Sequence, residues 1–135
     1  MYKTTIIYED YDGEEREEDF YFNLTVAEAL RLEVNTEGGL ESLITKITRA
    51  KDNAEIFRVF EDLIAYSYGE KSPDGRHFYK SPEITARFKS SLAYDEFFVR
   101  LFSDPQAASS FVKGIVPSKM ADKFAKIAGQ DPLPR

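Results

Sequence analysis

Over the first 24 residues the hydrophobic positions fall in two short runs separated by a polar, acidic stretch, whereas farther along the chain they recur every three to four residues. Residues 2–8 and 17–24 are rich in β-branched and aromatic side chains, which is typical of strands. Between them lies Asp12-Gly13, a dipeptide that favours a tight turn with positive φ at both residues. The pairs expected from such a two-residue loop are Tyr11 with Glu14 and Thr5 with Phe20.

From residue 25 onward, helix start and stop signals divide the apolar pattern. Thr25 and Glu28 have the spacing of a capping box, and Ser81-Pro82 and Asp104-Pro105 each join a capping side chain to a first-turn proline. The widest apolar stripe of the chain runs from Ile56 to Tyr68. We expect the helix that carries it to end at Gly69 in a left-handed cap. The pattern predicts six or seven short helices, beginning near residues 25, 40, 53, 82, 92, 105 and 118.

The predicted fold class is therefore α+β and predominantly α, within the size of one ordinary domain. We expect a single domain over residues 1–135, with a β-hairpin at 1–24, a helical body at 25–129 and a flexible tail at 130–135. A lone hairpin is marginal in water, so this one should pack on helices or extend the sheet of another subunit.

Charge is distributed unevenly along the chain. Residues 9–19 contain eight acids and one arginine, a net charge of −7, and because the whole chain carries −6 the remainder sums to +1. An acidic face repels phosphate backbones and the remainder has no excess of cations, so we expect no nucleic-acid partner. The simplest interpretation of the acidic run is a solvated hairpin tip.

Membrane and secretory functions are also not expected from this sequence. The longest apolar runs, such as Phe97-Phe98-Val99, are far shorter than the ~20 residues that cross a bilayer, and the N-terminus does not resemble a secretory signal. The absence of cysteine excludes disulfides and fits a reducing cytoplasm.

Residues that carry chemistry are sparse, and we expect no enzyme, cofactor or metal site. No phosphate-binding loop or dinucleotide fingerprint occurs, and a single histidine cannot supply the histidine pairs typical of catalytic zinc. His77 could act as a general base with Asp74 or Glu70, which would suit a small hydrolase, but a surface imidazole beside a turn is the simpler interpretation.

The segment from residue 66 to residue 83 interrupts the helical pattern. Ser72-Pro73-Asp74-Gly75 is typical of a type I turn, because proline fixes φ at the second position and glycine suits the fourth. We interpret the segment as an ordered connector whose cations Lys71, Arg76 and Lys80 point outward and form a rim for a partner.

Four blocks follow one another from about Glu18 to Pro117: EDFYFNLTVAEAL, NTEGGLESLITKI, FEDLIAYSYGEKSPDGRHFYKSPE and AYDEFFVRLFSDPQAASSFVKGIVP. In this order and at these spacings they resemble the tail assembly chaperones of long-tailed (siphovirus-type) bacteriophages and prophages.

The resemblance implies a protein that coats and solubilises the long helical tape measure protein, helps to recruit major tail (tube) protein subunits, and then leaves the finished tail. It also implies the host bacterial cytoplasm as the location, and a short form of a product that many relatives extend by frameshifting. The alternative is a non-enzymatic acidic adaptor or inhibitor of phage or prophage origin.

The aromatic content suits a protein that holds an amphipathic helical client, because such a protein needs apolar side chains to present. Most rings should be core, and the predicted inward-facing set is Phe57, Phe60, Phe97, Phe98, Phe102 and Phe111. The candidate partner-binding residues are Tyr66, Lys71, Arg76, Tyr79, Tyr94, Met120 and Phe124. The segment from Lys113 onward carries +3 against −7 at the hairpin tip, a difference that would favour head-to-tail association between subunits; the alternative is two independent solvated faces.

Overall fold

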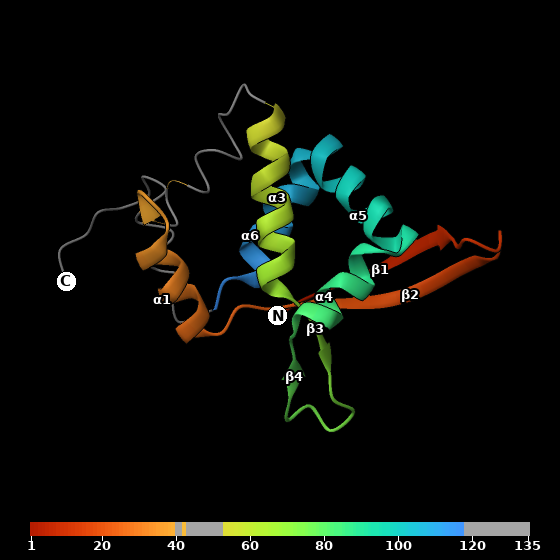
Figure 1. The fold of residues 1–135 in the computed structure, drawn as a ribbon, viewed down its shortest axis with the longest axis horizontal. Helices are drawn as coiled ribbons and strands as arrows, with labels where there is room; N and C mark the ends of the chain where they lie inside the picture. The colour runs from red at the N-terminus through yellow and green to blue at the C-terminus, as the bar shows by residue number, and fades with distance from the viewer. Residues whose placement is uncertain (40–41, 43–52, 118–135) are drawn as a thin grey trace.

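The computed structural model describes residues 1–39, 42 and 53–117 of the chain. Its strands are β1 (Tyr2–Glu9), β2 (Glu15–Phe22), β3 (Tyr68–Lys71) and β4 (Phe78–Tyr79). Its helices are α1 (Val26–Asn35), α3 (Asn53–Ser67), α4 (Pro82–Lys89), α5 (Leu92–Ser103) and α6 (Pro105–Ile115). The fold is α+β, with an N-terminal antiparallel hairpin and a helical body (Figure 1).

The described part of the chain contains five helices, so the predicted count of six or seven is too high for it. Three of these helices begin at the predicted caps, because the side chains of Thr25, Ser81 and Asp104 each accept a hydrogen bond from a first-turn backbone N–H. The predicted helices near residues 40 and 118 lie outside the described residues, as does the predicted tail at 130–135.

The N-terminal hairpin is confirmed, but its predicted register is wrong by one residue. Phe20 pairs with Thr4, and Thr5 pairs with Asp19. The cause is the loop at residues 11–13, which has three residues instead of the predicted two. Within this loop only Gly13 has a positive φ, +81°. The Asp10 carboxylate organises this loop by accepting hydrogen bonds from two backbone N–H groups and from Arg16 Nε. A one-residue shift exchanges the two faces of a strand, so the turn decides which side chains are buried.

The segment at 66–83 is a second β-hairpin and not only a connector between helices. The β3 strand pairs with β2 through Tyr21–Gly69 and Phe22–Tyr68, and β4 continues the four-stranded sheet. The predicted turn at Ser72–Gly75 is present, closed by the hydrogen bond from Gly75 N to Ser72 O at 3.0 Å.

The prediction that Gly69 forms a left-handed cap is wrong, because α3 passes directly into β3. A Cβ atom at Gly69 would lie 2.5 Å from the Phe78 ring and 2.8 Å from the Tyr79 carbonyl oxygen. The glycine therefore allows close packing across the second hairpin rather than a reversal of the helix.

An aromatic cluster forms the centre of the molecule. Phe22 is fully buried, stacks on Phe97 at 4.9 Å between ring centroids and meets Phe111 edge-on at 5.5 Å. Tyr68 stacks on Phe88 at 4.1 Å. These rings come from the sheet and from α4, α5 and α6, so the cluster joins the hairpin to the helical body.

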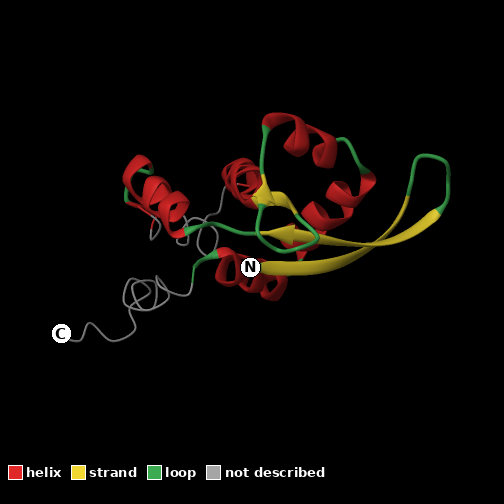
Figure 2. Cartoon of the chain, turned by 90° about the horizontal axis from the view of Figure 1, so that it is seen from below, coloured by secondary structure: helices red, strands yellow, loops and turns green. Residues whose placement is uncertain are grey.

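The helices gather around one half of the long hairpin and leave the acidic tip projecting beyond them (Figures 1 and 2). Helices α5 and α6 pack on β1, whereas α4 packs on β3. Helix α3 stands between α1 and α5 (Figure 1). Among the described residues, no helix has both the length and the apolar character needed to span a bilayer.

Candidate functional site

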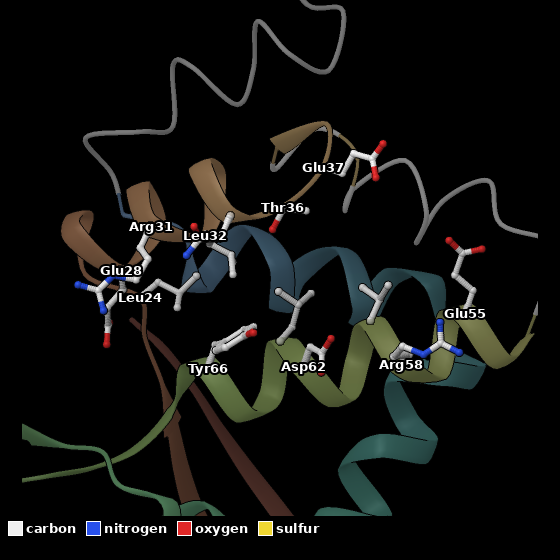
Figure 3. A pocket seen from close by; sticks show the side chains of 13 residues that line it. Leu24, Glu28, Arg31, Leu32, Thr36, Glu37, Glu55, Arg58, Asp62 and Tyr66 are labelled. Atoms are coloured by element: carbon white, nitrogen blue, oxygen red, sulfur yellow. The ribbon is translucent and has the colours of Figure 1, made fainter.

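A groove of about 570 Å³ lies between α1 and α3 (Figure 3). Four buried aliphatic residues form its floor: Leu24, Leu32, Val59 and Leu63. Six charged residues surround this floor: Glu28, Arg31, Glu37, Glu55, Arg58 and Asp62. Four acids and two bases give this rim a net charge of −2, and Tyr66 lies at one end of the α1–α3 groove.

The sequence builds the two walls by different means. Helix α1 begins with the predicted capping box, in which Glu28 N donates to Thr25 Oγ1 at 3.1 Å and Thr25 N donates to Glu28 Oε1 at 2.9 Å. Helix α3 carries apolar residues over a wide arc, so Phe60 and Ile64 are buried in the core while Val59 and Leu63 reach the groove.

Lys80 fastens the end of the groove at which Tyr66 lies. Its ammonium group donates to Asn23 O at 2.7 Å, to Glu28 Oε1 at 2.8 Å and to Tyr66 O at 2.8 Å. Burial opposes ionisation of Glu28, but the hydrogen bonds from Lys80 and Thr25 outweigh it and lower the pKa of this carboxyl. Lys80 thus ties the end of β2, the first turn of α1 and the last turn of α3 together.

The middle of the rim is less firmly held. Burial, with a smaller contribution from Glu61, raises the pKa of Asp62, and Arg58 and Lys89 only partly offset this. Within the described residues, no hydrogen bond or ion pair engages the side chains of Arg31, Arg58 or Asp62. These charges are therefore available to the polar edges of an occupant.

A second exposed apolar surface lies where α3 meets α5. Phe57 and Phe102, both predicted to face inward, are 41% and 39% exposed, so that prediction is wrong for these two rings. They contact each other at 4.7 Å between centroids, and Val99, one turn before Phe102, is 55% exposed. Each ring packs on neighbouring rings and keeps an outer side exposed to solvent.

The structure distributes the predicted partner-binding residues over separate places. Tyr66 is 52% exposed and lines the groove, whereas Lys71, Arg76 and Tyr79 are exposed on the second hairpin. Tyr94 is half-buried against Phe88 and Phe98, and its pKa is raised by burial. The remaining two predicted residues, Met120 and Phe124, lie outside the described residues.

Sequence reasoning missed most of the groove, including Leu32, Arg58 and Asp62. A signal was present in α3, where Arg58 and Asp62 are four residues apart beside the apolar stripe and therefore lie on one face. Nothing in the local pattern indicated that α1 would lie opposite this face.

The alternative of a hydrolase centred on His77 finds no assembled site. The His77 backbone N–H donates to Ser72 Oγ, and its exposed ring stacks on Tyr79 at 5.8 Å. The Asp74 carboxylate accepts from Ser72 Oγ, which lowers its pKa, while Glu70 pairs with Arg87. In the described ranges, no group of three His, Asp or Glu side chains could hold a metal ion.

Comparison with protein families decides between the remaining interpretations. The family model described as phage tail assembly chaperone matches residues 1–131. This chain belongs to that family. Searches of curated proteins and of solved structures found no match.

Membership of the tail assembly chaperone family confirms the resemblance and indicates binding to tail proteins in general. It also suggests a non-enzymatic role, since a chaperone acts by contact with other chains. The α1–α3 groove and the exposed rings at the meeting of α3 and α5 are the apolar surfaces that such contacts can use.

Proposed function

We propose that this tail assembly chaperone binds and solubilises the tape measure protein through the α1–α3 groove and helps to recruit tail tube subunits. The observation that carries the proposal is the groove itself, with an aliphatic floor beneath a charged rim. An amphipathic helix presents the complementary pattern, an apolar stripe flanked by polar side chains.

The dimensions of the groove support a helical client. Helix α1 has ten residues and is therefore about 15 Å long at ~1.5 Å per residue. A wall of this length can cover two to three turns of a client helix, enough for apolar residues at positions i, i+3, i+4 and i+7. A very long client would then need many chaperone copies, each covering a short stretch.

The acidic hairpin supports a role in assembly by contact with other subunits. Residues 9–19 around its tip contain eight acids and one arginine, a net charge of −7, and the tip projects past the helices (Figure 1). Such a tip can steer a basic surface of a neighbouring chaperone or of a tube subunit, and the contact would weaken with salt. In this proposal the protein acts in the host bacterial cytoplasm, self-associates along its client and leaves the finished tail.

The experiment is co-expression with the tape measure protein encoded in the same genome, followed by measurement of soluble tape measure protein and of its co-purification. Tyr66→Asp places a carboxylate in the groove at an exposed position, and it should reduce co-purification at least tenfold. Val34→Asp is the matched control, because Val34 is an exposed residue of α1, 79% accessible, that does not line the groove.

Equal loss in both variants, or unchanged binding in Tyr66→Asp, would remove the groove as the client site. Replacement of Glu14, Glu15 and Glu17 by lysine tests the acidic adaptor alternative with the same assay. If the hairpin variant loses all partner binding while Tyr66→Asp loses none, the acidic tip is the functional surface.

A further inference from the structure

Three exposed side chains form one row along the α3 wall of the α1–α3 groove. Arg58, Asp62 and Tyr66 follow one another at four-residue spacing, and all three line the groove (Figure 3). Residues four apart on a helix lie on one face, so the row places a cation, an anion and an aromatic ring on successive turns. Val59 and Leu63, which are buried, belong to the adjoining apolar floor. An occupant that lies on the floor therefore meets the row with one of its flanks.

The two charges of this row are not paired within the described part of the chain. Their spacing would allow an ion pair, but none joins Arg58 to Asp62, and no printed hydrogen bond or ion pair engages either side chain. Burial raises the pKa of Asp62, and the nearby charge of Arg58 offsets this only in part. A cation brought by an occupant would stabilise the ionised carboxylate of Asp62, and an acid would do the same for Arg58.

We propose that the groove selects a client helix whose flank toward α3 carries one acidic and one basic side chain a single turn apart. The acid meets Arg58 and the base meets Asp62, while the apolar stripe of the helix covers the floor. The pair also sets the register of the helix along the groove, because a shift by one turn brings charges of like sign together. This inference rests on the proposed function, since it names the chemistry of the helix that the groove takes.

The charge row and the net charge of the rim favour different helices. The rim as a whole carries −2, which by itself would favour the most cationic helix. The row favours a flank with both signs, because a lysine in place of the acid would face Arg58. The order of affinities among helices that differ only in these two positions therefore tests the proposal.

The probes are three synthetic amphipathic peptides about 15 residues long, near the minimum for a stable helix, with one common leucine stripe. Each flank carries two test positions four residues apart, occupied by glutamate and lysine, by glutamine and lysine, or by glutamate and glutamine. Because both flanks are alike, either direction of the peptide presents the test positions to α3. Fluorescence anisotropy with the full chain at low salt measures the dissociation constants.

The glutamate–lysine peptide should bind about threefold more tightly than either of the others, as expected for one additional exposed ion pair. Net rim charge alone would instead make the glutamine–lysine peptide the tightest binder. Arg58→Met should remove the advantage over the glutamine–lysine peptide, and Asp62→Asn should remove the advantage over the glutamate–glutamine peptide.

Arg31→Met is the matched control, because Arg31 is an exposed arginine that lines the groove from α1. It should leave both affinity ratios unchanged. Equal affinities of the three peptides, tightest binding of the most cationic one, or loss of the ratios in Arg31→Met would each overturn the proposal. Equal binding of all three would leave the groove as a helix site and remove only the charge match. Absence of binding by all three would remove the proposed function of the groove as well.

Discussion

The two long sides of α3 differ in what covers them. On one side Phe60 and Ile64 are sealed into an aromatic core that includes rings from the sheet and from α5. On the other side Val59 and Leu63 form the floor of a groove that remains open to solvent. One helix thus serves both as a wall of the core and as a wall of the groove.

The difference follows from the residues that face α3. Aromatic rings meet in stacked or edge-to-face pairs and fill the space between elements. Helix α1 supplies no ring to its side, because residues 26–35 contain only aliphatic, polar and charged side chains. The aliphatic side chains of Leu24, Leu32 and Leu63 leave space beneath the charged rim, so a groove remains between α1 and α3. On the opposite side of α3, aromatic rings close the core.

The sharpest test of this comparison is removal of one ring from each environment. Phe22→Ala deletes a ring with no solvent exposure that contacts Phe97 and Phe111, so it should cost about 3–5 kcal/mol in the free energy of unfolding. Phe57→Ala removes a ring that is 41% exposed and should cost less than half as much. Urea denaturation of the two variants measures both values, and equal losses would show that the outer rings are as structural as the core.

A smaller effect is expected at the end of the groove. Lys80→Met keeps the apolar stem but leaves the Glu28 carboxylate and the carbonyls of Asn23 and Tyr66 without the ammonium group, which should cost about 1–3 kcal/mol. Faster hydrogen exchange should appear first in α1, whose anchorage through Glu28 would be lost.

Lys89→Met is the matched control for this change, because Lys89 is exposed at the end of α4 and should be neutral within about 0.5 kcal/mol. An unfolding free energy that is unchanged in both variants would mean that Lys80 does not hold the groove together.

The core was more predictable from sequence than the groove, because a buried helix face is marked by local periodicity whereas the groove depends on contacts between segments distant in sequence. Phe60, Phe97 and Phe111 were identified as core because helical periodicity marks a buried face locally. Phe57 and Phe102 satisfy the same periodicity yet stay exposed, since they lie where α3 and α5 meet and, among the described elements, none covers them. Periodicity identifies the apolar face of a helix but not the area of that face which another element covers.

Long-range pairings were the least predictable feature. The β3 and β4 strands have four and two residues, too few to show an alternating pattern, and β3 becomes a strand because it pairs with β2 across more than 40 residues of sequence. Likewise, the Lys80 contacts join three segments that no local motif connects. The capping box of Thr25 and Glu28 was predictable because it is a local motif, whereas its second use as a partner for Lys80 was not.

The smallest expected effect is that the groove side and the core side of α3 contribute to the stability of the protein with different pH dependence. Glu28 has a lowered pKa in the folded state, so its stabilising contribution is present above the ordinary value of 4.5 and is lost as the pH falls below that value. Glu28→Gln keeps an acceptor for the capping box but removes the charge that faces Lys80. The variant should therefore be less stable than the natural chain near pH 7, and the gap should close on acidification.

The core should respond at the opposite end of the pH scale. Burial raises the pKa of Tyr68 from 10.0 to about 12, so its stabilising contribution is present below pH 10 and is lost as the pH rises toward 12. Tyr68→Phe should reduce the loss of stability between pH 10 and pH 12 and leave the acid limb unchanged. Melting temperatures measured from acidic pH to pH 12 test both the Glu28→Gln and the Tyr68→Phe prediction. If Glu28→Gln altered the alkaline limb, or Tyr68→Phe the acid limb, the groove and the core would not be independent sides of α3.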